Sequence, residues 1–191
     1  MIRDIVVEKS KSHDLVNLPI VQQQEFLNEL MSSEYTEEKL AAIIYLQLNL
    51  KQFEISILLD QIEIWLDKEW IFDWNVCDWM CVRLLSPALD SFPDEVAHRL
   101  NDWSKAEYLW KARSSLVPFA QAKSLTDHLQ LVEKISIALI NRQERFSKTA
   151  VGWVLREIYK FDPRFVDEFL ETFHEQVTPE VRKNALKYAK K

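Results

Sequence analysis

Apolar residues recur along the chain at the three- and four-residue spacing of amphipathic helices. The pattern begins over 21–31, continues over 37–50, and places Leu58 and Ile62 on one stripe of 54–66. This spacing predicts helices, because apolar positions in strands alternate instead. Applied to the whole chain, it predicts about nine or ten helices of about 10–17 residues, joined by about 2–6 residues.

Side chains that can accept hydrogen bonds from the first turn of a helix mark several of these starts. Asp73 precedes an apolar run, and Asp162 and Thr178 each stand directly before a proline. Ser104 and Glu107 have the spacing of a capping box. Because short polar side chains satisfy the free N–H groups and proline fits the first turn, we expect helices to begin at these four places.

Short connections make consecutive helices antiparallel neighbours, and a series of such pairs stacks into a solenoid. A closed bundle is the alternative, but the helices are too numerous and too similar in length for one bundle core. We therefore predict an all-α fold, a right-handed α-solenoid of stacked antiparallel helix pairs of HEAT or armadillo type. We expect one domain over residues 1–191, in which residues 1–15 show little organisation and are disordered.

Composition supports this fold class. Apolar residues make up 48% and charged residues 28% of the chain, as in soluble globular proteins. There is one glycine, Gly152, where average usage would give about thirteen. Hairpin turns and phosphate-binding loops need glycine, so its scarcity argues against sheets and excludes glycine-rich nucleotide loops.

No apolar run approaches the length of a membrane span, and the N-terminus lacks a signal-peptide core. We expect no membrane association and a cytoplasmic protein, or a nuclear one in a eukaryote. Cys77 and Cys81 lie four residues apart on one predicted helix, where a disulfide would be strained. We predict that both are reduced core residues, with no metal site and no cofactor.

Charge is unevenly distributed along the chain. The net charge is −6, but residues 1–140 hold 13 Lys/Arg against 22 Asp/Glu, and residues 141–191 hold 11 against 8. The most basic stretch is the C-terminal tail, with Arg182, Lys183, Lys187, Lys190 and Lys191. A run of this kind is usually a solvated helix face, although a local basic face can bind phosphates on an acidic protein.

Tryptophan is frequent, and three of the seven tryptophans stand beside charged residues at helical spacing. Trp74 and Asp78 are four residues apart, so they share a helix face. Neither capping nor the helix dipole explains a carboxylate in the middle of this segment. Asp78 is either a structural residue paired with an arginine, a surface residue, or a carboxylate that faces a cleft.

Two later helices repeat an aromatic–arginine spacing. Trp110 and Arg113 are three residues apart, as are Trp153 and Arg156. Gly152 beside Trp153 suggests close approach of another helix or of a ligand, since glycine costs about 1 kcal/mol in a helix interior. Successive layers displaying aromatic and cationic groups on one face suit a nucleic-acid backbone.

Four segments in this order resemble the AlkD-type DNA alkylation-repair family: SSEYTEEKLAAIIYLQ, DWNVCDWMCVRLLSP, YLWKARSSLVPF and KTAVGWVLREIYKFDPRFV. The resemblance covers about residues 25–191. It implies a solenoid of HEAT-like repeats that acts on duplex DNA carrying alkylated bases. The implied activity is that of a monofunctional DNA glycosylase, which excises cationic N3- and N7-alkylated purines. We expect it to work as a monomer.

The same resemblance implies roles for individual residues. Asp78 is the implied catalytic carboxylate, Trp74 and Trp153 flank the deoxyribose of the lesion, and Arg113 is the arginine of the third site motif. Arg156 corresponds to a DNA-backbone contact. Further DNA-contact candidates are Trp110, Lys148, Arg182 and Lys183.

Two other functions remain open. Ala112 precedes Arg113 where the family pattern has a second basic residue, which leaves room for a non-catalytic family member that binds nucleic-acid structure. The acidic net charge leaves room for a solenoid that binds proteins and has no role on DNA. The charge around Trp74 and Trp153 would separate these hypotheses.

Overall fold

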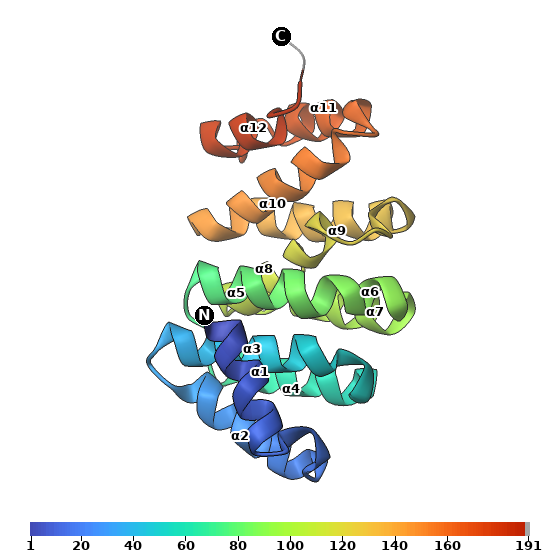
Figure 1. Cartoon of the computed structure of the whole chain (residues 1–191). Coiled ribbons are helices and arrows are strands. Elements are labelled where there is room, and N and C mark those ends of the chain that lie inside the picture. Colours follow the sequence, from blue (N-terminus) through green and yellow to red (C-terminus); the bar gives the residue numbers. More distant parts are fainter. Residues whose placement is uncertain (190–191) are drawn as a thin grey trace.

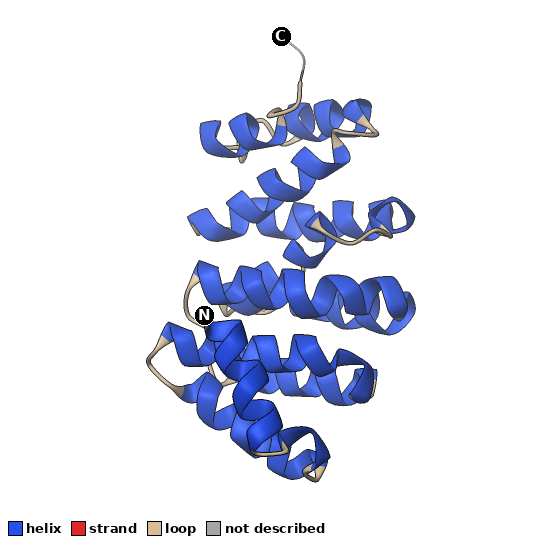
Figure 2. Cartoon of the chain, viewed as in Figure 1, coloured by secondary structure: helices blue, strands red, loops and turns tan. Residues whose placement is uncertain are grey.

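The computed structural model describes residues 1–189, and over this range every regular element is helical. The helices stack one pair above another from the N-terminus to the C-terminus, which gives an elongated α-solenoid (Figures 1 and 2). The predicted fold class is confirmed.

Two layers of helices run along the stack. The first, named here the α4 layer, contains α2 (Ile20–Ser32), α4 (Ile55–Asp67), α7 (Pro93–Trp103), α9 (Leu129–Ile140) and α11 (Pro163–Thr172). The second, the α5 layer, contains α3 (Thr36–Asn49), α5 (Trp74–Met80), α8 (Leu109–Ser114), α10 (Arg145–Ile158) and α12 (Pro179–Ala185). In the α5 layer each helix packs against the next one, and one continuous apolar core lies between the layers.

The N-terminal residues differ from the prediction. Residues 2–12 form the helix α1 (Ile2–Ser12), so the expected disorder over 1–15 is wrong. One face of α1 packs on α3, which buries Ser10 and brings Val6 against the core. The segment is polar on average, and its order therefore depends on a partner helix that local periodicity does not reveal.

Three of the predicted helix starts are confirmed by their hydrogen bonds. The Asp73 carboxylate accepts from the backbone N–H groups of Asn75, at 2.8 Å, and Val76, at 3.0 Å. Asp162 and Thr178 accept in the same way at the starts of α11 and α12. These caps fix where α5, α11 and α12 begin.

The predicted capping box at Ser104 and Glu107 is wrong. Helix α7 continues to Trp103, and the Ser104 hydroxyl donates to the Asn101 carbonyl at 2.6 Å, at the end of that helix. Helix α8 begins only at Leu109. The serine therefore satisfies a C-terminal carbonyl of one helix, a role that the spacing alone does not distinguish from an N-cap.

Helix α5 does not end at Met80 but passes through a π-helical turn, η3 (Cys81–Leu85), into α6 (Ser86–Ser91). The Ser86 backbone N–H donates to the carbonyl of Cys81, five residues earlier. The Ser86 hydroxyl donates to the carbonyls of Cys81, at 3.2 Å, and Pro118, at 2.7 Å. The wide turn thus keeps its hydrogen bonds directly before Pro87, which has no N–H to give.

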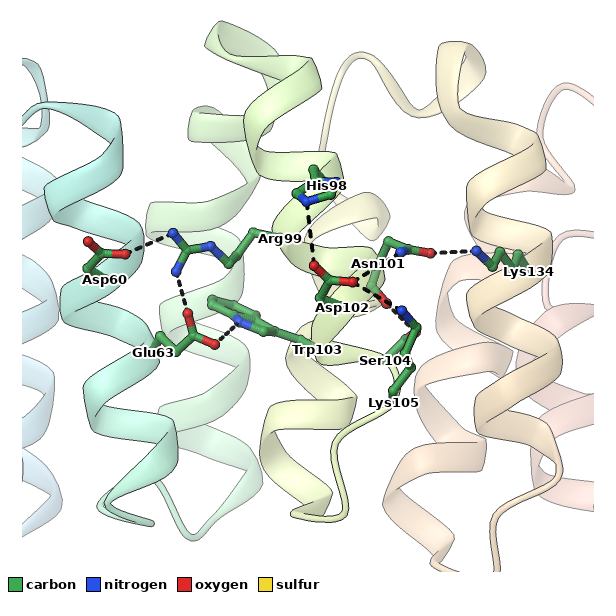
Figure 3. Close-up of polar contacts among 10 residues, drawn as sticks. All are labelled: Asp60, Glu63, His98, Arg99, Asn101, Asp102, Trp103, Ser104, Lys105 and Lys134. Atoms are coloured by element: carbon green, nitrogen blue, oxygen red, sulfur yellow. Dashed lines mark hydrogen bonds and ion pairs between the residues drawn. The ribbon is translucent and has the colours of Figure 1, made fainter.

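Polar side chains join neighbouring helices of the α4 layer at Glu63 (Figure 3), and Lys111 extends the network to the α5 layer. The Glu63 carboxylate pairs with Arg99 of α7 and Lys111 of α8, and it accepts from the Trp103 indole N–H at 3.0 Å. Arg99 also pairs with Asp60 at 2.8 Å. Burial acts to raise the pKa of Glu63, but the hydrogen bonds from these donors outweigh it and hold that pKa below its usual range.

Replacing Glu63 with glutamine tests this network. Because the cations on α7 and α8 lose their shared partner, the free energy of unfolding at pH 7 should fall by about 1–3 kcal/mol. The folded-state pKa of Glu63 is lowered, so its contribution is complete above the unfolded-chain value of about 4.3 and is lost as the pH falls through the folded value.

Urea denaturation at pH 7 and at acid pH measures both effects. The gap between wild type and Glu63→Gln should close on acidification. Glu133→Gln, an exposed position on α9, is the control and should leave stability within about 0.5 kcal/mol. A Glu63→Gln protein as stable as the control at pH 7 would contradict the prediction.

Candidate active site

Three neighbouring helices of the α5 layer bring together Asp78 on α5, Arg113 on α8 and Trp153 on α10. The Arg113 guanidinium donates to both oxygens of the Asp78 carboxylate, from Nε to Oδ1 at 2.8 Å and from Nη2 to Oδ2 at 2.9 Å. The exposed fractions of the two side chains are 5% for Arg113 and 15% for Asp78. This is a bidentate, nearly buried ion pair, the strongest geometry that these two groups can form.

Arg113 also reaches the next helix of the layer. Its Nη1 donates to the Phe146 carbonyl at 2.5 Å and to the Thr149 hydroxyl at 3.3 Å. Burial acts to lower the pKa of Arg113, but the hydrogen bonds and the charge of Asp78 outweigh it and raise that pKa. Arg113 therefore stays charged, and its contacts join α5, α8 and α10 at one point.

A shallow pocket of about 220 Å³ opens at the exposed side of this ion pair. Its lining residues are Asp78, Trp79, Val82, Arg83, Gln121 and Trp153. The structure thus places Asp78 and Trp153 in the same pocket, as their predicted roles require. Among the described residues, the buried indole N–H of Trp153 has no hydrogen-bond partner.

Trp74 lies outside this pocket. It is the first residue of α5, its side chain is 55% exposed, and it stands one helical turn before Asp78. The pocket extends from Asp78 in the opposite direction along the helix, toward Val82 and Arg83. A ligand would have to extend beyond the pocket to contact Trp74, whose role stays a prediction.

Trp79, Arg83 and Gln121 line the pocket, although the sequence analysis did not select them. The Arg83 guanidinium lies 5.1 Å from the centre of a Trp79 ring, a cation–π contact. Their four-residue spacing, which places an aromatic and a cationic side chain on one helix face, could have identified Trp79 and Arg83 from the sequence. Gln121 follows a 3₁₀ turn, η4 (Val117–Ala120), and carries no comparable signal.

Arg156 and Lys148, two predicted DNA contacts, form hydrogen bonds with other residues of the protein. Arg156 donates to the Glu157 carboxylate at 2.9 and 2.7 Å and to Asn184 at 3.4 Å, and its guanidinium lies 5.9 Å from a Trp153 ring. Lys148 donates to a backbone carbonyl, that of Gln176, at 3.0 Å. Arg156 thus lies beside the pocket, but a phosphate would compete with Glu157 for it.

The structure does not support the predicted DNA contact at Trp110. This side chain is only 8% exposed and packs against the Phe146 ring, with 5.3 Å between ring centroids. The indole therefore contributes to the core rather than to a binding surface. The three-residue spacing from Arg113 does place both residues on α8, but packing against α10 covers them.

The basic residues of α12 lie at the end of the α5 layer. Arg182 and Lys183 are exposed, and Arg182 donates to the Leu170 carbonyl at 3.1 Å. Lys183 lines an open depression with Asn184 and Lys187. The predicted basic tail also includes Lys190 and Lys191, which lie outside the described residues.

Both cysteines are buried and free behind the pocket, as predicted. The Cys77 thiol lies 3.4 Å from the Ser114 hydroxyl. Burial, followed by contact with Cys77, raises the pKa of the Cys81 thiol well above its usual range. A thiolate nucleophile at Cys81 is therefore disfavoured.

The two layers differ in charge. The five helices of the α5 layer together carry eight Lys/Arg and five Asp/Glu, whereas the five helices of the α4 layer carry three Lys/Arg and twelve Asp/Glu. The acidic net charge therefore belongs mainly to the layer opposite the pocket. Within residues 1–189, no cluster of acidic, histidine or cysteine side chains could hold a metal ion, and no helix is long and apolar enough to cross a membrane.

Comparisons relate this chain to known proteins. Residues 2–189 match the model of a protein family described as DNA alkylation repair enzyme. A solved structure of a predicted DNA alkylation repair enzyme from Enterococcus faecalis has the same fold, with a TM-score of 0.80 at 19% sequence identity, over 95% of this chain and 83% of that chain. No curated protein sequence matches the chain.

Gly152 lies where α10 and α12 approach each other closely. A Cβ at residue 152 would lie 3.1 Å from the carbonyl oxygen and 3.2 Å from the Cα of Val181 in α12. The sequence suggested that either a helix or a ligand approaches this glycine, and the structure shows the close approach of a helix. Only glycine lets α10 and α12 meet at this distance without a backbone shift.

We expect Gly152→Val to lower the free energy of unfolding by about 1–3 kcal/mol, because the added methyl groups meet backbone that moves only with the whole of α12. Urea denaturation measures this loss. Gly152→Ala should show a smaller loss, since the better helix propensity of alanine offsets part of the overlap. A valine variant as stable as wild type would contradict the packing argument.

Proposed function

The chain belongs to the DNA alkylation repair enzyme family, and from this premise we propose that it is a DNA glycosylase. Its substrate would be duplex DNA carrying cationic N3- or N7-alkylated purines, and its reaction the hydrolysis of the N-glycosidic bond. The observation that carries this proposal is the carboxylate of Asp78, held in a fixed orientation by Arg113 in a pocket that Trp153 also lines. The protein would act as a monomer without a cofactor.

The chemistry needs little beyond a placed negative charge. When the bond between C1′ and the purine nitrogen breaks, its electron pair stays on the base, which becomes neutral. Positive charge then develops on the deoxyribose. A carboxylate whose position is set before the reaction stabilises that charge without reorganisation. Asp78 fits this role, since its orientation is set by two hydrogen bonds to one guanidinium.

The ion pair does not use up the carboxylate. An ionised carboxylate has about four lone-pair positions on two oxygens, and Arg113 occupies one on each oxygen. The remaining positions are available to a sugar at the pocket. Arg113 reduces the net negative charge, so the proposed catalytic effect rests on the proximity of Asp78 to the sugar more than on total charge.

The indole of Trp153 supports the same step. An indole face attracts a neighbouring cation through its quadrupole, and a deoxyribose that gains positive charge is such a cation. Trp153 lines the pocket together with Asp78. We propose that the sugar lies between these two groups, with Trp74 contacting the strand beyond the pocket.

An alkylated purine that is already cationic leaves without prior protonation, so the site needs no general acid. Water adds to C1′ and releases one proton, which leaves an abasic site and a free base. The described residues at the pocket include no lysine that could form a Schiff base. This agrees with simple hydrolysis rather than strand cleavage through an imine.

One observation favours a second candidate, a non-catalytic family member that binds nucleic-acid structure. Both oxygens of Asp78 are bonded to Arg113, as expected for a purely structural pair. This candidate predicts that Asp78→Asn leaves DNA binding unchanged and that wild type releases no base. The charge difference between the layers supports DNA as the partner in either case.

Release of 7-methylguanine and 3-methyladenine from methylated duplex DNA tests the proposal. Wild type should release base, and Asp78→Asn should be slower by at least about 100-fold, since a neutral amide cannot stabilise the sugar cation. Removing one partner of a buried ion pair also costs about 3–5 kcal/mol, so the assay must be run below the melting temperature of the variant.

Asp90→Asn is the matched control. Asp90 is partly buried and accepts hydrogen bonds from Ser124 at 3.0 and 2.9 Å, but it does not line the pocket. It should lose stability and keep base release. If wild type binds DNA and releases no base, the glycosylase proposal fails. An Asp78→Asn variant with a wild-type rate would remove Asp78 from the mechanism.

A further inference from the structure

Arg83 is a cation at the pocket whose charge the protein does not balance. Its side chain is exposed, and within residues 1–189 it makes no ion pair and no side-chain hydrogen bond. The nearby carboxylate of Asp78 is paired with Arg113 and not with Arg83. Together, Asp78, Arg83 and Arg113 leave one excess positive charge at the pocket.

Three of the cations selected from the sequence are less available. Arg113 is buried against Asp78, Arg156 is paired with Glu157, and Lys148 donates to a carbonyl. A phosphate approaching Arg113 or Arg156 would compete with the carboxylate paired to it, and Lys148 already has one of its three N–H donors engaged. A phosphate would meet no such competition at Arg83, whose guanidinium lies over the Trp79 ring and pairs with no carboxylate of residues 1–189.

The contact with Trp79 also limits where the guanidinium can go. The ring centre lies 5.1 Å from the guanidinium carbon, and the indole is itself 37% exposed. Stacking on an aromatic face leaves the edge of the guanidinium, with its N–H donors, free for an anion. A side chain held in this way loses less conformational entropy on binding than a free arginine would.

We propose that Arg83 binds a backbone phosphate of the DNA strand that carries the damaged nucleotide, next to the deoxyribose that Asp78 faces. The proposal rests on the proposed function for the identity of the ligand. Asp78 and Arg83 line the same pocket, as a sugar and an adjacent phosphate of one strand would require. Arg83 is thus a binding residue that positions the strand, and Trp79 is the residue that positions Arg83.

The salt dependence of binding to an undamaged duplex tests the contact without any catalysis. Removing one phosphate contact lowers the slope of log affinity against log salt by about 0.9. Arg83→Ala should therefore bind more weakly at low salt, and its deficit relative to wild type should shrink by about 3.5-fold between 50 and 200 mM salt. Arg83→Lys keeps the charge and should retain the wild-type slope with weaker binding.

Arg164→Ala is the matched control, because it removes one exposed arginine from α11 in the opposite layer. Its slope should equal that of wild type. In base release, Arg83→Ala should raise KM. Its kcat should stay within about threefold of the wild-type value, since the proposed contact of Arg83 is with the phosphate and not with the sugar.

A slope for Arg83→Ala equal to that of Arg164→Ala would overturn the inference, as would an absence of DNA binding by wild type. The two proposals fail separately. If wild type releases no base but Arg83→Ala still lowers the slope, the phosphate contact stands and the glycosylase proposal falls. If base release depends on Asp78 while Arg83→Ala leaves the slope unchanged, the glycosylase proposal stands and the phosphate contact falls.

Discussion

The ion pair between Arg113 and Asp78 is the interaction on which the pocket depends. Either charge alone would be costly to bury, and together they satisfy each other through two parallel hydrogen bonds. Arg113 continues to the Phe146 carbonyl, so one guanidinium joins three consecutive helices of the α5 layer. The same contact sets the direction of the Asp78 carboxylate and leaves the charge of Arg83 unbalanced. The structural and the proposed chemical roles of this pair are therefore inseparable.

Local hydrogen bonding was the most predictable part of the fold. Asp73, Asp162 and Thr178 cap the helices that follow them because the partner N–H groups lie two or three residues away. Ser104 has the same chemistry but serves the end of the preceding helix. Burial was less predictable, since Trp110 has the same spacing from an arginine as Trp153 and is covered by a neighbouring helix. Which tryptophans face the pocket depends on packing between neighbouring helices, which spacing alone cannot give.

The distribution of charge resolves the contrast between an acidic protein and a family that acts on DNA. Acidic residues concentrate on the α4 layer, where Glu63 forms its network, while the later helices of the α5 layer are basic. A polyanion approaching the molecule would therefore experience an orienting field as well as an attraction. The net charge of the whole chain therefore averages over an acidic surface and a basic one.

The π-helical turn at Cys81–Leu85 carries a consequence for how the gene can change. The turn contains one residue more than an α-helical turn, directly between the pocket-lining part of α5 and the core-facing part of α6. An in-frame deletion of a single codon here would remove the extra residue, and a regular α-helical turn would then join α5 to α6 with little change in the phase of α6. Ala88 and Leu89 would therefore stay buried, and Asp78 would keep its place. The loss of one codon would therefore be tolerated at this turn, whereas within the regular helix α10 it would rotate every later residue of that helix by about 100°.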